Sequence, residues 1–216
     1  MNYSVIVRFL GILLFIEGIF MFSALPFSYY YGGSDSNAII ASGIITIIFG
    51  VLFRLITREA DEKSIGKKEG YVIVTFSWVV ISIFGTLPYL LSNSISNFTD
   101  AFFETISGFS TTGASILTDI EAVPKGILFW RSMTHWIGGM GIVVLTVAIL
   151  PFLGIGGMQL FNAEASGPTK DKLHPRITEA AKRLWGIYVL LTVLETALLL
   201  AGGMNLFESL CHSFGT

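Results

Sequence analysis

Five long apolar runs separated by polar segments constrain the fold of this chain more than any other feature. They cover residues 5–25, 38–53, 71–91, 129–150 and 184–201. A helix of ~20 apolar residues crosses a bilayer. The mean hydropathy is +0.73 and 13% of the residues are charged, whereas soluble domains average about 25%. The sequence therefore predicts an all-α, polytopic membrane protein.

The first run also has features of a signal peptide, because Arg8 precedes an apolar stretch and Ser23-Ala24 could be a cleavage site. The length of the run and its interruption by Glu17 favour a membrane span instead. An acid inside a span indicates a functional site. The alternative is a carboxyl group that is satisfied by neighbouring helices.

Basic residues mark two loops as cytoplasmic. The first group is Arg54, Arg58, Lys63, Lys67 and Lys68, and the second is Lys170, Lys172, Arg176, Lys182 and Arg183. By the positive-inside rule these segments face the cytoplasm, and so does the N-terminus. The first group could instead bind anionic lipid or a partner, but a topology signal is the preferred interpretation.

A short, uncharged, hydroxyl-rich segment, residues 107–115, lies between the third and fourth runs. We expect a helix at 100–110 before it, with Thr99 or Asp100 as N-cap and Glu104 in or just past the first turn. This helix is about half as long as a span. The pattern predicts a re-entrant pore loop, and a plain connection between helices is the alternative.

Backbone carbonyls in such a turn can replace the hydration shell of a cation. Gly113 permits the positive φ that would turn a carbonyl toward a pore. The negative end of the pore-helix dipole would point at the ion where Ser110 meets Thr111. Glu104 and Asp100 are expected near the outer mouth.

The fourth run contains Gly138, Gly139 and Gly141, which predict close helix packing or, alternatively, a bend used in gating. Arg131 either extends to water or pairs with an acid and braces the pore.

An enzyme is not expected. Cys211 is the single cysteine, and His135, His174 and His212 lack the spacing of a zinc site. His135 and Glu195 form the only conceivable buried pair, and no nucleophile accompanies them.

The end of the chain repeats the pore unit. Residues 205–213 are a second short amphipathic stretch, and Phe214-Gly215-Thr216 resembles the start of a second turn. The repeat aligns 107–110 with 213–216, or 103–105 with 207–209. We therefore expect either an N-terminal portion of a longer protein or several copies around one pore.

These features divide the chain into four parts. They are an N-terminal helix pair and loop (1–70), a first pore unit (71–151), a cytoplasmic loop (152–183) and the start of a second pore unit (184–216). The first pore unit consists of span 71–91, pore helix 100–110, filter 111–115 and span 129–150.

The sequence resembles the TrkH/TrkG-type subunits of bacterial Trk potassium uptake systems, within the superfamily that includes KtrB, fungal Trk and plant HKT proteins. The residues that match are Ser107–Ala114, Phe129–Ser132, His135–Gly141, Ala163–Lys172, Pro175-Arg176 and Leu184-Trp185. The helix pair before the pore unit is similar to TrkH rather than KtrB.

The resemblance implies four pore units around one potassium pathway in the bacterial inner membrane. Thr111, Thr112, Gly113 and Ala114 would form the K⁺ filter, with Thr111 and Thr112 as K⁺ ligands, and Glu104, Ser110 and Arg131 would support the pore. K⁺ would be the transported ion, with no tightly bound cofactor. The resemblance further implies a homodimer and a cytoplasmic, TrkA-like nucleotide-binding regulatory subunit. A non-conducting scaffold or assembly subunit is the alternative.

Overall fold

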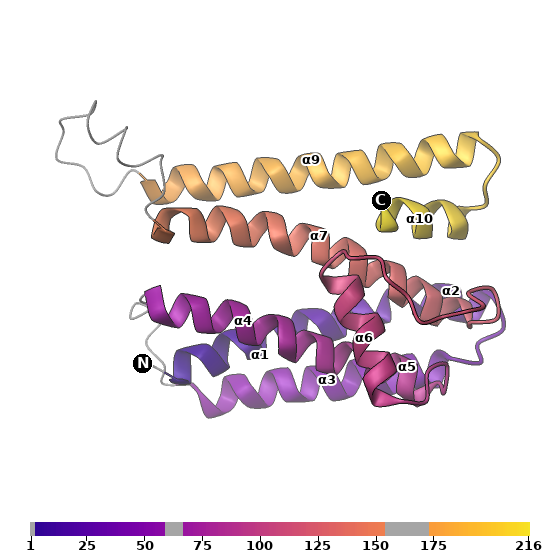
Figure 1. The fold of residues 1–216 in the computed structure, drawn as a ribbon, viewed down its shortest axis with the longest axis horizontal. Helices are drawn as coiled ribbons and strands as arrows, with labels where there is room; N and C mark the ends of the chain where they lie inside the picture. The colour runs from indigo at the N-terminus through magenta and orange to yellow at the C-terminus, as the bar shows by residue number, and fades with distance from the viewer. Residues whose placement is uncertain (1–2, 59–66, 154–172) are drawn as a thin grey trace.

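The computed structural model describes residues 3–58, 67–153 and 173–216, and all regular elements within them are α-helices, which confirms the predicted fold class (Figure 1). They are α1 (Tyr3–Phe22), α2 (Leu25–Tyr30), α3 (Ser36–Ile56), α4 (Lys67–Gly85), α5 (Leu87–Leu91), α6 (Phe98–Phe109), α7 (Lys125–Leu153), α9 (Leu173–Ala201) and α10 (Leu206–Gly215).

Four segments are long and apolar enough to span a membrane: Tyr3–Tyr30, Ser36–Ile56, Glu69–Leu91 and Lys182–Ala201. At 29 residues, α7 also exceeds the ~20 residues that a span requires. α9 begins at Leu173, inside the segment 152–183 that is predicted as a cytoplasmic loop, and its part that is long and apolar enough to span a membrane begins at Lys182. Residues 179–184 are Glu, Ala, Ala, Lys, Arg and Leu, all good helix formers, so charge did not prevent a helix there.

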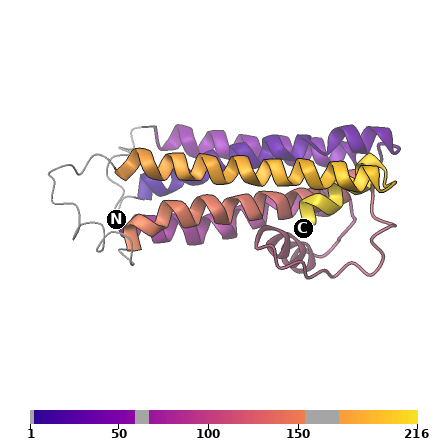
Figure 2. The same ribbon diagram turned by 90° about the horizontal axis from the view of Figure 1, so that it is seen from above.

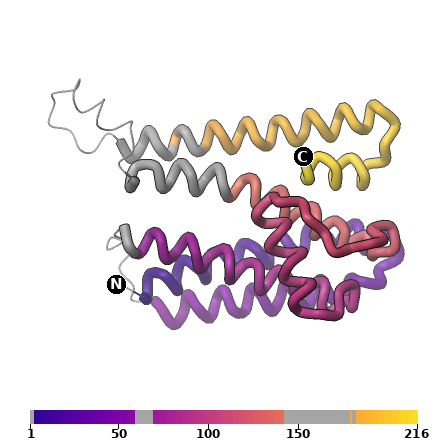
Figure 3. The backbone as a smooth tube through the Cα atoms, in the orientation of Figure 1, coloured from indigo at the N-terminus to yellow at the C-terminus, as the bar shows by residue number. Residues whose placement is uncertain are grey.

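The long helices lie roughly parallel or antiparallel in one elongated bundle (Figures 1 and 2). α1 begins, α3 ends, α4 begins, α7 ends and α9 begins at the same end of the molecule. The short helices α6 and α10 stop part way along the bundle, as the backbone tube shows (Figure 3). We call the opposite end, where α2 and α5 lie, the distal end.

Glycines bring α1 and α3 together. A Cβ added at Gly11 would lie 2.8 Å from the carbonyl oxygen of Gly50, and one at Gly18 would lie 2.9 Å from that of Gly43. Helices in lipid associate through such small residues because close backbone contact replaces the hydrophobic driving force. The N-terminal helices therefore form a tightly packed pair.

The span from α4 to α5 is interrupted at Thr86. Pro88 has no N–H group and cannot continue the helical hydrogen bonds. The Nε1–H group of Trp130 on α7 donates a hydrogen bond of 3.1 Å to the carbonyl oxygen of Gly85. Trp130 is 1% exposed, so this buried indole ties the break in one span to the next.

Asp35 connects the N-terminal pair to the pore unit. Its carboxylate accepts a hydrogen bond of 2.9 Å from the backbone N–H of Ile127 in the first turn of α7. The Ser28 hydroxyl also donates to Asp35. Gly126 leaves room for this contact, because a Cβ there would lie 2.5 Å from Asp35 Oδ2. Asp35 thus acts as a distant cap for α7, where a negative charge complements the helix dipole.

Candidate functional site

The predicted pore helix exists as α6, but it begins earlier than expected. Its N-cap is Asn97, whose side chain accepts a hydrogen bond of 3.0 Å from the N–H of Thr99. The predicted caps, Thr99 and Asp100, instead lie inside the first turn. All three residue types are good caps, so composition could not identify which one ends the extended segment.

A tight turn ends α6 and starts the predicted filter. The N–H of Thr111 donates to the carbonyl of Gly108, and the N–H of Thr112 donates to that of Ser107, both at 2.9 Å. This is a Schellman motif, in which the residue after the cap adopts a left-handed conformation. Thr111 occupies that position with φ +55°, and Gly113 follows with φ +74°. The positive φ expected at Gly113 is present, but that at Thr111 was not foreseen.

The carbonyl groups of the predicted filter differ in whether they accept a hydrogen bond. Within the described residues, those of Thr111, Thr112 and Gly113 accept no hydrogen bond. The Ala114 carbonyl accepts a hydrogen bond of 2.6 Å from the Ser107 hydroxyl. Residues 111–116 are all exposed. The turn therefore presents three unengaged carbonyls, and the fourth is tied back to the pore helix.

Ser110, one of the predicted supporting residues, is the C-cap of α6. Its hydroxyl lies 2.8 Å from the Thr112 hydroxyl. Both side chains are exposed at the turn, so Ser110 bonds within the filter segment rather than to a neighbouring helix.

Glu104 holds the segment that leaves the turn. Its carboxylate accepts hydrogen bonds of 3.0 Å from the Ser115 hydroxyl and from the N–H of Ile116. It also forms an ion pair of 2.5 Å with Arg131 Nε on α7. Glu104 is 1% exposed, whereas Asp100 is partly exposed; the place of both residues near the outer mouth stays a prediction.

The ion pair decides between the two interpretations of Arg131. Its side chain is 16% exposed and pairs with Glu104, so Arg131 does not extend to water. A buried carboxylate with a cation and two further donors has its charge and lone pairs satisfied. One side chain thereby joins α6, the outgoing filter segment and α7.

The C-terminal end of α6 packs directly on α7. A Cβ added at Gly138 would lie 2.1 Å from the Phe109 carbonyl oxygen, and one at Gly108 would lie 2.1 Å from Thr134 Oγ1. At Gly139, an added Cβ would lie 2.7 Å from the Tyr188 hydroxyl of α9. The packing role predicted for these α7 glycines is therefore present.

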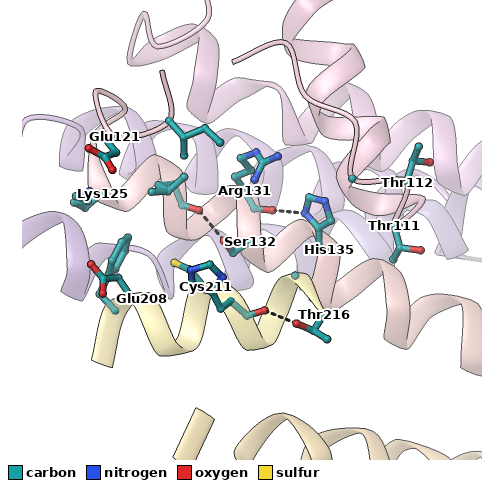
Figure 4. Close-up of a pocket in the computed structure, with 16 residues that line it drawn as sticks. Thr111, Thr112, Glu121, Lys125, Arg131, Ser132, His135, Glu208, Cys211 and Thr216 are labelled. Atoms are coloured by element: carbon teal, nitrogen blue, oxygen red, sulfur yellow. Dashed lines mark hydrogen bonds between the residues drawn. The ribbon is translucent and has the colours of Figure 1, made fainter. Parts of the chain in front are cut away.

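A cavity of about 910 Å³ lies between the filter turn, α7 and α10 (Figure 4). Thr111 and Thr112 stand at one end of it, and Glu121, Lys125 and Glu208 stand at the other. His135 and Ser132 of α7 lie between these two groups. The cavity thus places the unengaged carbonyls next to a polar space bounded by charges of both signs.

α10 repeats the start of α6. Its N-cap is Asn205, whose side chain accepts a hydrogen bond of 2.9 Å from the N–H of Glu208. Asn205 follows Asn97 by 108 positions. This spacing differs by a few residues from that of the two alignments expected from the sequence, which stay predictions.

Glu17 is 4% exposed, and neither of its carboxylate oxygens has a hydrogen-bond partner among the described residues. The interpretation that neighbouring helices satisfy this carboxyl is therefore wrong. A Cβ at Gly85 would lie 3.1 Å from Glu17 Oε1 and 2.6 Å from Thr105 Cγ2, so the carboxyl lies behind the pore helix.

The described residues contain no group of three or more His, Cys, Asp or Glu side chains that could hold a metal ion. Sequence reasoning also missed Ser107 and Asp35, whose partners lie 7 and 92 positions away. Spacing along the chain carries no signal for the second of these contacts.

Comparisons with known proteins agree with this geometry. The family profile described as TrkH, cation transport protein, matches residues 35–216. The potassium uptake protein TrkH of Halomonas elongata is 44% identical over 100% of this chain and 45% of its own length. The TrkH protein of Escherichia coli K12 is 42% identical with the same coverage.

A solved structure is also similar. The crystal structure of the potassium transporter TrkH from Vibrio parahaemolyticus aligns with a TM-score of 0.85 and 34% sequence identity, covering 99% of this chain and 42% of that one. The chain thus spans under half the length of the relatives that it matches.

Proposed function

This chain belongs to the TrkH family of cation transport proteins, and on that premise we propose that it contributes the first filter segment of a Trk-type potassium pathway. The family is one of transport proteins rather than enzymes. The four long apolar segments agree with a multi-pass membrane location. K⁺ is the transported ion in this proposal, coordinated by carbonyl groups of Thr111, Thr112 and Gly113, with Ala114 at the end of the segment.

One observation carries the proposal: three successive residues at the C-terminal end of α6 have carbonyls without a hydrogen bond among the described residues, and all three residues line the cavity. A dehydrated cation needs several such oxygens in place of water. Irregular backbone at membrane depth is tolerated only where protein buries it or where it lines water.

The pore helix supplies an electrostatic reason for cation binding. α6 ends at the filter turn, and Thr111, Thr112 and Gly113 of that turn line the cavity. The C-terminal end of a helix carries a partial negative charge of about half an electron. This helix end lowers the energy of a cation in the cavity.

The ion pair between Glu104 and Arg131 would keep the filter segment in place. A filter must hold its oxygens against the attraction of the ion and against one another. Glu104 fixes Ser115 and Ile116, which directly follow the proposed ligands. The ion pair with Arg131 in turn connects Glu104 to α7, the longest helix beside the cavity.

Further properties follow from the family alone and are part of the proposal. They are assembly as a homodimer, regulation by a cytoplasmic, TrkA-like nucleotide-binding subunit, and location in the bacterial inner membrane. A cytoplasmic N-terminus is supported by Arg8 in the first turns of α1, Arg54 in the last turn of α3 and Arg58 just beyond α3, all at the same end of the bundle.

The test is potassium uptake by cells that lack their own uptake systems and carry the complete gene product containing this chain. Gly113→Ser forces a side chain into φ +74° and is expected to lower K⁺ uptake at least tenfold and to reduce the preference for K⁺ over Na⁺. Gly203→Ser is the matched control, because Gly203 has φ +98° and, like Gly113, no atom within 4 Å of an added Cβ.

The scaffold alternative makes a different prediction. If the turn only connects helices, both serine substitutions change protein stability by similar amounts and neither changes ion preference. Normal K⁺ uptake and K⁺/Na⁺ preference in Gly113→Ser, with the protein inserted at wild-type levels, would rule out the filter assignment.

A further inference from the structure

A second cavity, of about 460 Å³, lies at the end of the bundle opposite the distal end. Arg8 of α1 and Arg54, Val51 and Leu55 of α3 line it, together with Arg58 just beyond α3. Three guanidinium groups from two helices therefore surround one space. Val51 and Leu55 are 40% and 62% exposed, so the cavity opens beside apolar side chains on the outside of the bundle.

The local hydrogen bonds explain only part of this arrangement. Arg8 donates a bond of 3.5 Å to the Arg58 carbonyl, as expected of a cation at a helix C-terminus. Within the described residues, the side chains of Arg54 and Arg58 have neither a hydrogen bond nor an ion pair. Both are exposed. Helix capping therefore accounts for Arg8 and leaves two cations directed at the same cavity.

The position of the cavity indicates what it could hold. α3 has 21 residues, which is about the thickness of the hydrocarbon core. Its last turns therefore lie at a boundary between lipid tails and head groups. A ligand there meets cations on its polar side and apolar side chains along its length. Among molecules at that boundary, an anionic phospholipid has this combination of charge and apolar surface.

We propose that Arg8, Arg54 and Arg58 form a binding site for the phosphate head group of an anionic phospholipid, whose acyl chains run along Val51 and Leu55. Arg guanidinium groups suit phosphate because their planar forks donate paired hydrogen bonds. The site belongs to the N-terminal helix pair, so it would couple lipid composition to the stability of that pair. It is separate from the ion pathway, and its test does not depend on the potassium assignment.

The experiment measures thermal unfolding of the complete, detergent-purified protein as phosphatidylglycerol or phosphatidylcholine is added. We expect phosphatidylglycerol to raise the unfolding midpoint and phosphatidylcholine to leave it unchanged. In Arg54→Gln/Arg58→Gln the apparent affinity should fall about 25-fold, since each interfacial cation contributes about fivefold. Arg54→Lys/Arg58→Lys keeps both charges but not the planar forks, so its apparent affinity should lie between those of the wild type and of the glutamine variant.

Lys182→Gln/Arg183→Gln is the matched control. It removes the same charge from α9, and both of these residues are exposed but line neither cavity. An equal loss in this control would mean that general surface charge, not a site, attracts the lipid. Equal stabilisation by both lipids, or by inorganic phosphate alone, would also overturn the proposal. The proposal would also fail if Arg54→Gln/Arg58→Gln responded to phosphatidylglycerol as the wild type does but no longer bound a cytoplasmic protein. That result would assign the arginines to the protein partner.

Discussion

Thr111 has a left-handed backbone conformation that is unfavourable for a residue with a side chain. Two helices of this chain end in the same Schellman hydrogen-bond pattern, and α9 places Gly203 at the left-handed position with φ +98°. α6 places Thr111 there instead. A left-handed conformation costs a residue with a Cβ about 1–2 kcal/mol, and such strain accumulates at functional sites. Since Thr111 lines the cavity, we interpret the strain as the cost of a fixed carbonyl direction.

Thr111→Gly tests that interpretation. Glycine removes the steric conflict, so the unfolding midpoint should rise by an amount that corresponds to about 1 kcal/mol. The turn also gains freedom, so the preference for K⁺ over Na⁺ should fall. Thermal unfolding of the purified proteins measures the first effect, and uptake of K⁺ in competition with Na⁺ measures the second. A lower midpoint would show that the threonine side chain contributes more to stability than its backbone strain costs.

At the scale of single elements, close contact between α6 and a glycine of α7 determines where α6 lies. The Phe109 carbonyl lies where a side chain at Gly138 would begin, so α6 and α7 touch backbone to backbone. Over-packing of such a contact typically costs about 1–3 kcal/mol. The position of the filter therefore depends on one residue of the neighbouring span having no side chain.

Gly138→Ala should lower the unfolding midpoint and K⁺ uptake together, because α6 must move to make room. Gly186→Ala provides the comparison: Gly186 lies within α9, and an added Cβ there meets nothing within 4 Å. That change should raise helix stability by about 0.5–1 kcal/mol and leave uptake unchanged. If both variants behave alike, contact with α6 is not what restricts position 138.

The helices were predicted well from the sequence wherever the length of an apolar run distinguishes one kind of helix from another. The long helices and the short pore helix were expected, because apolar run length separates a span from a half-span. The start of α9 at Leu173 was not expected, since basic residues were taken as a loop signal although they also favour helices. The cap Asn97 was missed because Asn97, Thr99 and Asp100 are all suitable cap residues. The buried place of Glu104 depends on a tertiary contact with Arg131, which residue type alone does not specify.

At the scale of the whole molecule, Asp35 links the N-terminal helix pair to the segment proposed as the filter. It caps α7 at Ile127, and Arg131 lies four residues further along the same helix. Arg131 holds Glu104, which in turn holds Ser115. A continuous series of polar contacts therefore runs from the loop before α3 to the filter segment.

Asp35→Asn keeps one acceptor but removes the charge that complements the start of α7. A lost cap and dipole contact together cost about 1–2 kcal/mol, so a lower unfolding midpoint and a weaker K⁺ preference are expected. Asp119→Asn is the control, because Asp119 accepts only from Glu121 and Ala122 in its own exposed loop. Equal effects of the two substitutions would indicate that Asp35 is only a local turn residue.

The two pore helices begin on amides rather than on acids. Asn97 and Asn205 are exposed, and each accepts a backbone hydrogen bond that starts its helix. An amide does not titrate, whereas an aspartate in the same place would lose its charge as the medium became acidic. These caps face the side of the membrane away from the arginine-bearing helix ends, which in our proposal is the external medium. The cap residue of each pore helix therefore keeps its hydrogen bond whatever the external acidity, a condition that the cell does not control.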